Sequence, residues 1–369
     1  MKCIRVGLVG FGFAGRIFQS NVIEAVEGLE LAAIVQRSGG SAAAAFPHVK
    51  IVPSVEALLE DTSIRVVVVA TPNATHLPIA RQCLLAGRDV VIDKPFAVSS
   101  KEAEELIRLA RSQRRLLSVY QNRRWDGDFL TVRKLIEDDR LGRLVKFESH
   151  YDRYRQVPRL HAWREDGSAG GGVLFDLGAH LVDQALVLFG VPHSVWASVR
   201  VEREGARIED AFDLYLHYPA PLGKVSNSPA GPVPSGLGVW LRATCLARDP
   251  DARFTLNGTQ GTFRKFGIDP QEAHLLAGDM FSSKPWGVES PEHWGTLITD
   301  EGGDPVSTRV PTEPGDYRGY YINLRDALHG NAALEVTPVQ AWKTMRILEM
   351  AVESSRTGGT IACDWTLEP

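Results

Sequence analysis

Cysteine is scarce in this chain, and the few cysteines lie far apart. They are Cys3, Cys83, Cys245 and Cys363, and no two of them form a C-x-x-C pair. This spacing indicates neither a disulfide framework nor a zinc site, and it is typical of a protein kept in a reducing compartment. We therefore expect a cytoplasmic protein without disulfide bonds and without a bound metal.

Long hydrophobic runs are absent as well. No apolar stretch approaches the ~18 residues that a membrane-spanning helix needs. The strand-like run that includes Ile4, Val6, Leu8 and Val9 starts almost at the first residue, which leaves no room for a signal peptide. We expect no membrane partner and no export.

The chain also lacks a large excess of either charge. Its 41 Lys and Arg residues nearly balance 45 Asp and Glu residues, for a formal net charge of -4. Such a balance gives no reason to expect binding to nucleic acid or to an anionic membrane surface, so a small molecule is the expected partner. A length of 369 residues exceeds one ordinary core and predicts two domains.

A glycine motif with a defined mechanism opens the first domain. Gly10-Phe11-Gly12-Phe13-Ala14-Gly15 follows a predicted strand and precedes a helical segment and a second strand, Leu29–Val35. In this setting Gly10 allows a tight turn, Gly12 lets the backbone approach a pyrophosphate, and Gly15 lets helix and strand pack closely. The alternative is a glycine-rich turn without a ligand. The motif predicts a Rossmann dinucleotide-binding domain over residues 1–121.

The residues at the end of the second predicted strand bear on the choice of cofactor. NAD-binding units place Asp or Glu there for the ribose 2′-hydroxyl, whereas this chain has Gln36-Arg37-Ser38. Arg37 with Ser38 suits a 2′-phosphate, which favours NADP over NAD. Alternatively, Arg37 is a solvated loop residue and Gln36 serves the ribose of NAD.

Two further polar segments follow predicted parallel strands. Thr71-Pro72-Asn73, with His76 soon after, follows Val66–Val69, and Asp93-Lys94-Pro95 follows Asp89–Ile92. Ligands of open α/β sheets bind at the carboxyl ends of strands, so both segments are candidate cofactor contacts. His76 equally suits a helix cap. The Lys94 ammonium is placed to touch both nicotinamide and substrate, although a Lys-Pro after a strand is ordinary.

The second half of the chain has the pattern of an α+β domain over residues 122–369. Short, mostly alternating runs joined by turn residues predict an antiparallel sheet with one covered face. Pro219–Gly236 is expected to form an extended hairpin loop, and two helices close the chain. The predicted strands are Leu144–Tyr151, Val195–Val201, Ala211–His217, Val239–Cys245, Arg253–Leu256 and Gly261–Phe263.

A polar stripe runs along an otherwise apolar helix predicted from Val173 to Phe189. Asp176, His180 and Asp183 stand at i, i+4 and i+7, which places them on one side of an α-helix. Buried carboxylate and imidazole groups need hydrogen-bonding partners. The partner is either a polar ligand or, in the alternative, the Asp-His pair itself, which then merely pins the helix.

Together these motifs resemble the glucose-fructose oxidoreductase / inositol dehydrogenase (Gfo/Idh/MocA) family over essentially the whole chain. Gly170-Gly171-Gly172 before Asp176-x-x-x-His180 belongs to the same pattern. Four further segments resemble the branch that holds NADP-dependent scyllo-inositol dehydrogenases: Gln121–Asp128, His150–Arg155, Gly267–Glu272 and Lys284–Gly287.

The resemblance implies an enzyme that transfers a hydride between NADP or NAD and a hydroxyl or carbonyl carbon of a sugar or cyclitol. It implies Lys94, Asp176 and His180 as the catalytic residues, with His180 as general base, Asp176 orienting it or holding a substrate hydroxyl, and Lys94 donating to the reacting oxygen. Asp93 stands where the family more often has Glu, which keeps the charge.

The remaining site expectations follow from the same resemblance. Trp163-Arg164 resembles a pair that reaches the cofactor, and Asn122 is a further cofactor candidate. The family's sheet often forms the dimer interface, so we expect a homodimer or homotetramer. Substrate candidates are Tyr151, Arg153, Asp176 and His180, with Arg155, His161 and Asp183 as further pocket candidates, although such arginines and tyrosines also suit subunit interfaces.

Two rival functions stay open at this level. One is a regulator of the same fold that binds dinucleotide and sugar without turnover. The other is a metal-dependent enzyme using His76, Asp176, His180 and Asp183, although hydride transfer with a Lys and a His needs no metal.

Overall fold

The computed structural model describes residues 3–159, 162–167, 170–219, 236–282 and 285–365. The predicted loop Pro219–Gly236 falls almost wholly outside these ranges, as do His161 and Lys284. Within the described residues the chain forms two compact units. Neither unit is one continuous segment: unit 1 comprises residues 1–126, 270–287 and 315–345, and unit 2 comprises residues 127–269, 288–314 and 346–369. The division predicted between residues 121 and 122 stays a prediction.

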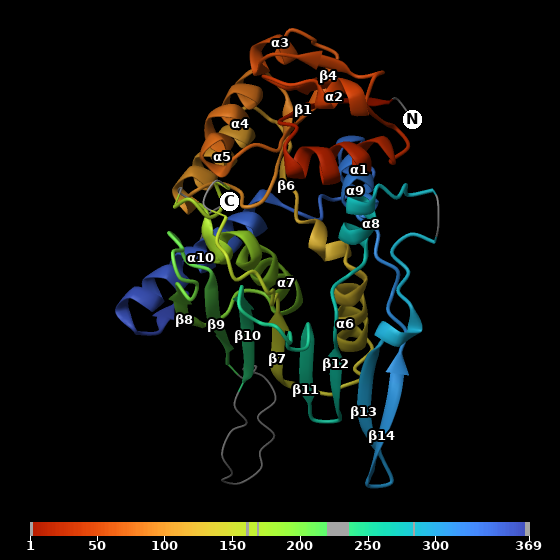
Figure 1. The fold of residues 1–369 in the computed structure, drawn as a ribbon, viewed down its shortest axis with the longest axis vertical. Helices are drawn as coiled ribbons and strands as arrows, with labels where there is room; N and C mark the ends of the chain where they lie inside the picture. The colour runs from red at the N-terminus through yellow and green to blue at the C-terminus, as the bar shows by residue number, and fades with distance from the viewer. Residues whose placement is uncertain (1–2, 160–161, 168–169, 220–235, 283–284, 366–369) are drawn as a thin grey trace. The chain divides into compact units, whose positions relative to one another are not determined.

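Unit 1 is built on a six-stranded parallel sheet with the strand order β3-β2-β1-β4-β5-β6 (Figure 1). This is the order of a Rossmann fold, and it reverses between β1 and β4, the point where such sheets bind dinucleotides. The strands are β1 (Ile4–Val9), β2 (Leu29–Val35), β3 (Lys50–Val52), β4 (Ile64–Val69), β5 (Asp89–Ile92) and β6 (Leu117–Val119).

The helices of unit 1 include short π-helical and 3-10 pieces beside the α-helices. Ser99 caps α5 by accepting a hydrogen bond from the N–H of Glu102. The helical elements of unit 1 are η1 (Gly15–Gln19, π), α1 (Ser20–Glu24), α2 (Ser41–Ala45), α3 (Val55–Leu59), η2 (Asn73–Thr75, 3-10), α4 (His76–Leu85), α5 (Ser100–Ser112), η3 (Asn122–Trp125, 3-10), α8 (Gln271–Ala277) and α9 (Arg318–Leu328). Helix α10 (Pro338–Thr357) begins in unit 1 and continues beyond it.

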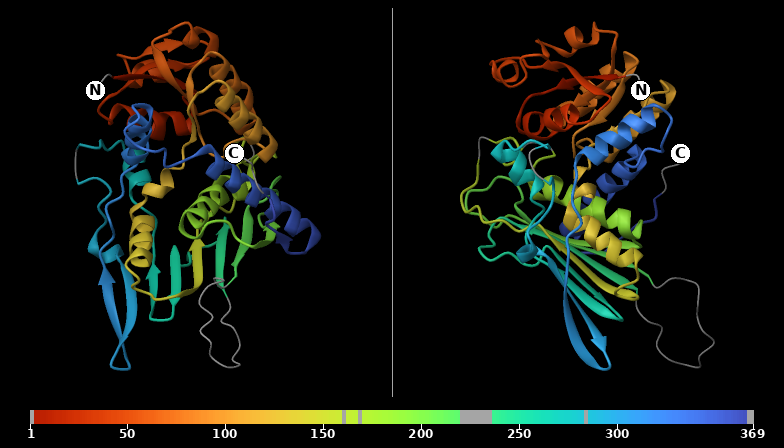
Figure 2. Two further views of the ribbon diagram at one scale, coloured as in Figure 1. Left: turned by 180° about the vertical axis from the view of Figure 1, so that it is seen from behind. Right: turned by 90° about the vertical axis from the view of Figure 1, so that its right-hand side faces the viewer.

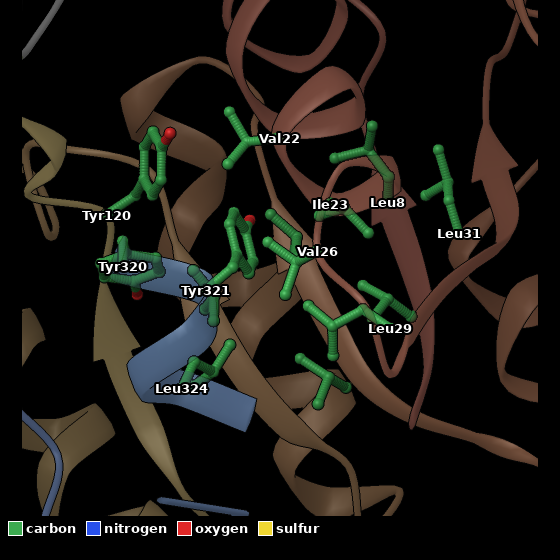
Figure 3. Close-up of a cluster of buried hydrophobic side chains, with 14 of the residues drawn as sticks. Leu8, Val22, Ile23, Val26, Leu29, Leu31, Tyr120, Tyr320, Tyr321 and Leu324 are labelled. Atoms are coloured by element: carbon green, nitrogen blue, oxygen red, sulfur yellow. The ribbon is translucent and has the colours of Figure 1, made fainter. Parts of the chain in front are cut away.

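The later segments of unit 1 complete its core. Tyr320 and Tyr321 of α9 pack their rings against Tyr120, and Figure 3 shows these tyrosines beside the aliphatic side chains that line β1 and α1. The Tyr320 hydroxyl donates to Ser118 Oγ at 2.8 Å. All three rings are buried, so the first 126 residues alone would expose a large apolar face.

Unit 2 is built on a nine-stranded sheet with the order β14-β13-β12-β11-β7-β10-β9-β8-β15. All its pairs are antiparallel except β7 with β10, so the predicted open, mainly antiparallel sheet is confirmed. The strands are β7 (Leu144–His150), β8 (Ser194–Arg200), β9 (Ala211–Tyr218), β10 (Leu237–Thr244), β11 (Phe254–Gly258), β12 (Gly261–Lys265), β13 (Gly295–Glu301), β14 (Asp304–Val310) and β15 (Ile361–Ala362).

Helices α6 (Gly127–Glu137) and α7 (Ala179–Phe189) lie on one face of this sheet, as Figure 2 shows in yellow and green. Two shorter helical pieces are η4 (Leu174–Gly178, π) and η5 (Pro291–His293, 3-10). The hairpin of β13 and β14 was not predicted from the sequence. No helix in the described part of the chain has the length and apolar character needed to span a membrane.

Candidate active site

The glycine motif of unit 1 has the geometry that its sequence predicts. Gly10 has a φ of +99°, and a Cβ there would meet the Ala70 carbonyl oxygen at 2.5 Å. A Cβ on Gly15 would overlap the Gly10 carbonyl oxygen, whereas a Cβ on Gly12 would meet no described atom within 4 Å. The backbone at Gly12 is therefore open to a ligand, which fits a pyrophosphate approaching the turn after β1.

At the end of β2, Gln36 is already engaged with the protein. Its Nε2 donates to Ser41 Oγ at 2.8 Å, and its Oε1 accepts from the N–H of Ala42 at 3.0 Å, so the amide caps α2. Arg37 and Ser38 are exposed. The exposed Arg37 guanidinium and Ser38 hydroxyl can bind a 2′-phosphate. The Gln36 amide already has hydrogen-bonding partners in the protein, so it is less suited to bind a ribose hydroxyl.

His76 joins the segments that follow β4 and β5. The ring is fully buried, with Nε2 at 2.9 Å from the Thr71 carbonyl oxygen and Nδ1 at 3.0 Å from that of Pro95. Burial lowers the pKa of His76, an effect larger than the opposing influence of the Asp93 carboxylate. A neutral ring can donate to only one of these two carbonyl oxygens, so His76 links the two loops through one hydrogen bond and packs against the other loop, which is an indirect way to shape a cofactor site.

Asp93 and Lys94 stand directly after β5. The carboxylate of Asp93 is buried and accepts a hydrogen bond from the N–H of Lys94 at 3.0 Å. The Lys94–Pro95 peptide bond is cis, and the Lys94 side chain is half-buried. Asn122, at the start of η3 after β6, is buried. Unit 1 thus gathers its candidate residues at the carboxyl ends of β1, β2, β4, β5 and β6.

In unit 2 the predicted polar stripe begins on a π-helical turn. The helix predicted from Val173 is continuous: Gly172 and Val173 are α-helical, Leu174–Gly178 is a π-helical turn, and α7 follows from Ala179. Because a π turn is closed by i→i+5 hydrogen bonds, the register of Asp176 relative to His180 differs from that of a regular α-helix. Asp176 is partly exposed, whereas His180 and Asp183 are buried. Single π turns inside helices occur frequently at functional sites.

An arginine faces Asp176, the partly exposed carboxylate of the stripe. Arg164 Nε lies 3.4 Å from Asp176 Oδ1, and its guanidinium stacks 4.5 Å from the centre of the Trp163 ring. The Arg164 carbonyl oxygen accepts from the N–H of Gly172 at 2.8 Å, so this segment returns to the start of the helix. The predicted Trp163-Arg164 pair and Asp176 therefore lie together.

The other substrate candidates differ in exposure. Tyr151 is fully buried, and the guanidinium of Arg253 lies 4.0 Å from the centre of its ring. Arg153 is half-buried and ties its backbone to Thr244, while Arg155 is exposed. The burial of Tyr151 shows that this ring packs in the domain core.

One side-chain group in the described residues has spacing compatible with a metal ion. His150, Asp152 and Asp251 bring their ligand atoms within 4.8 Å of one another. Arg242, however, lies 3.8 Å from the Asp251 carboxylate and would repel a cation there. Of the residues in the metal-dependent alternative, His76 already has both ring nitrogens beside carbonyl oxygens.

Glu209 was not predicted as a site residue from the sequence. Its carboxylate lies against Gly172, where any added side chain would overlap it, and its carbonyl oxygen accepts from the N–H of Val173 at 3.1 Å. Burial raises the pKa of Glu209 to about 7, against the lowering effect of a hydrogen bond from the Leu174 N–H. The three glycines before the helix were the one sequence signal of this close packing.

Two family models match the chain in succession. Residues 4–121 match the NAD-binding Rossmann fold of an oxidoreductase family, and residues 133–363 match the C-terminal alpha/beta domain of the same family. The chain belongs to the Gfo/Idh/MocA oxidoreductase family. It is therefore an enzyme of the NAD(P)-dependent oxidoreductase class, as the resemblance of its motifs implies.

Relatives within the Gfo/Idh/MocA family match over nearly their whole length. An uncharacterized oxidoreductase of Escherichia coli K12, YdgJ, is 39% identical, with 97% of this chain and 98% of the relative covered. The scyllo-inositol 2-dehydrogenase (NADP(+)) IolW of Bacillus subtilis 168 is 35% identical, with 97% and 95% covered. The structure of YPO2259 from Yersinia pestis superposes with a TM-score of 0.90 at 38% identity, covering 99% of each chain.

Proposed function

We propose that this enzyme transfers a hydride between NADP and a secondary hydroxyl or carbonyl carbon of a sugar or cyclitol, with inositol-like polyols as the first substrates to test. The observation that carries the proposal is the ion pair between Asp176 and Arg164. Asp176 lies on the π turn before α7, four residues before the buried His180. The likeness to a scyllo-inositol 2-dehydrogenase supports the substrate class.

The chemistry assigns one role to each residue. When bound, the nicotinamide supplies C4 as the hydride acceptor for alcohol oxidation. His180 takes the hydroxyl proton as the hydride leaves the same carbinol carbon, and it returns that proton in the reductive direction. Lys94 donates a hydrogen bond to the reacting oxygen and stabilises its developing negative charge. Asp176 orients His180 or holds a neighbouring substrate hydroxyl.

The preference for NADP rests on the end of β2. No carboxylate stands there for a ribose 2′-hydroxyl, Gln36 is committed to α2, and Arg37 and Ser38 are exposed. An arginine with a neighbouring hydroxyl complements a phosphate group.

The decisive experiment is a panel of inositols and aldoses assayed with NADP and NAD by nicotinamide absorbance, using wild type, His180→Asn and Lys94→Met. We expect turnover on at least one polyol and a loss of about a hundredfold or more in kcat for each variant, while dinucleotide affinity changes little. Wild-type-like turnover in His180→Asn would refute the catalytic assignment. Ligand binding by wild type without turnover on any member would favour the regulator instead.

We further propose that unit 2 mediates a homodimer or homotetramer through its sheet. Half-exposed aromatic side chains line successive strands, and Tyr215 packs against Trp240 with ring centres 4.5 Å apart. Aromatic residues are enriched at subunit interfaces. Light scattering should show a smaller particle for Trp240→Glu than for wild type and for the control Leu276→Glu, an exposed position in α8. An unchanged particle size would refute this interface.

A further inference from the structure

The segment that carries Trp163 and Arg164 contains no described helix or strand, yet it is fastened at both ends. Near its start, Tyr154 forms a β-bridge with Leu246, and the N–H of Arg155 donates to the Cys245 carbonyl oxygen at 2.7 Å. Near its end, Gly172 donates its N–H to the Arg164 carbonyl oxygen. What holds the middle of the segment is a charge cluster around a buried arginine.

This cluster consists of Arg203, Glu165 and Asp210, and we refer to it as the Arg203 cluster. The Arg203 side chain is 2% exposed. Its Nε lies 2.8 Å from Asp210 Oδ2 and its Nη2 lies 3.0 Å from Glu165 Oε2. Its Nη1 donates to the Arg155 carbonyl oxygen at 3.2 Å. One guanidinium thus links three separate parts of the chain.

Both carboxylates of the Arg203 cluster are further satisfied by hydrogen bonds. Asp210 accepts from the N–H groups of Glu202 at 2.7 Å and Arg203 at 3.2 Å. Glu165 accepts from the N–H of Arg159 at 2.9 Å and from its Nε at 3.1 Å. A buried ion pair with this many hydrogen bonds fixes geometry, and removing one member leaves the others uncompensated.

The Arg203 cluster is connected through the backbone to Arg164, the residue that faces Asp176. Glu165 is the next residue after Arg164, so anchoring its carboxylate restricts where the Arg164 backbone can lie. Arg164 in turn places Nε 3.4 Å from Asp176 Oδ1. Arg200, three residues before Arg203, pairs instead with Glu202 and Asp213.

We infer that Arg203 and Glu165 are positioning residues for catalysis: they hold Arg164 in register with Asp176. This inference rests on the proposed function for its kinetic consequence, because that proposal makes Asp176 part of the catalytic machinery. Its structural consequence, a segment held in place by the Arg203 cluster, is independent of the substrate.

The kinetic test uses Glu165→Gln, which keeps the shape of the side chain and removes its charge. We expect kcat to fall about tenfold, since a hydrogen bond to a charged group is lost, and KM for the dinucleotide to change by no more than it does in Arg164→Ala. In an Arg164→Ala background the same substitution should cause little further loss, because both changes act through Arg164. Losses that multiply in the double variant would overturn the inference.

The structural test needs no substrate. Trypsin should cleave after Arg159 several-fold faster in Glu165→Gln and in Arg203→Gln than in wild type, as followed by mass spectrometry, because a released segment is more often accessible. Arg200→Gln is the matched control and should leave this rate unchanged. Equal cleavage in wild type and Glu165→Gln would overturn the inference even if Arg203→Gln fails to fold. Faster cleavage together with no polyol turnover by wild type would uphold the positioning and reject the proposed function.

Discussion

The carboxylate of Glu209 fills the space that a side chain on Gly172 would need. Gly172 also has a φ of +82°, a region that other residues rarely adopt. Gly172→Ala should therefore lower the free energy of unfolding by about 2 to 4 kcal/mol, combining backbone strain with overlap. Urea denaturation would measure this loss.

Gly205→Ala is the matched control for that substitution. Gly205 has a φ of +75° but open space where a Cβ would lie, so only the loss from backbone strain, about 1 kcal/mol, is expected. Combining Gly172→Ala with Glu209→Ala should recover the loss caused by overlap. Equal losses for the two glycine variants would show that Glu209 does not occupy this space.

Glu209 should make stability depend on pH. Its pKa is raised to about 7 in the folded protein from an ordinary 4.5, so the folded state holds the proton more tightly than the unfolded state. The contribution of this proton binding to the free energy of unfolding is fully present below pH 4.5, and it is lost as the pH rises through about 7. Glu209→Gln, which stays neutral, should match wild type near pH 4 and exceed it near pH 8 by up to about 3 kcal/mol.

Denaturation curves across this pH range provide the check. Glu204→Gln, at an exposed position five residues earlier in the chain, is the control and should follow wild type throughout. If wild type and Glu209→Gln show parallel pH profiles, the Glu209 carboxyl is not the group responsible.

Arg37 should control the choice of cofactor. Arg37→Ala is expected to lower kcat/KM for NADP relative to NAD by about tenfold or more, because a charge-assisted contact to the 2′-phosphate is lost. Arg115→Ala, an exposed arginine just before the amino end of β6, should leave the ratio unchanged. An unaltered ratio in Arg37→Ala would rule out the phosphate contact.

Lys265 should be essential to the stability of unit 2. Its side chain is completely buried, with Nζ 2.8 Å from Glu289 Oε1 and 2.7 Å from the Phe266 carbonyl oxygen. Lys265→Met should cost about 3 to 5 kcal/mol, because the buried Glu289 carboxylate is left without its cation. Adding Glu289→Gln should restore much of the loss in thermal or urea denaturation. A double variant no more stable than Lys265→Met would argue against this explanation.

The Rossmann part of the fold was predictable because its signals are local. Leu29–Val35 and Asp89–Ile92 were predicted with the observed bounds, since buried parallel strands appear as short apolar runs between turn residues. The family motifs stand at the ends of these strands, so they could be placed from sequence as well.

The features that sequence reasoning missed depend on distant or exposed residues. Strand β14 is exposed along nearly all its length and lacks the alternation that identifies a half-buried strand. Only the Gly302-Gly303 turn indicated its hairpin. The Arg203 cluster joins residues 38 positions apart, and no local pattern specifies which carboxylate a buried arginine will meet.

The return of the chain to unit 1 has a consequence for biosynthesis. The hydroxyl of Tyr320 reaches Ser118 across 202 positions of sequence, and Tyr321 packs on Tyr120. During synthesis the strands of the parallel sheet leave the ribosome early. The residues of α9 that cover the core of unit 1 leave it only after most of unit 2 has been made. The nascent Rossmann segment therefore stays incomplete, with its apolar face exposed, until α9 has been synthesised. During this time, chaperone binding or misassembly competes with completion of the domain.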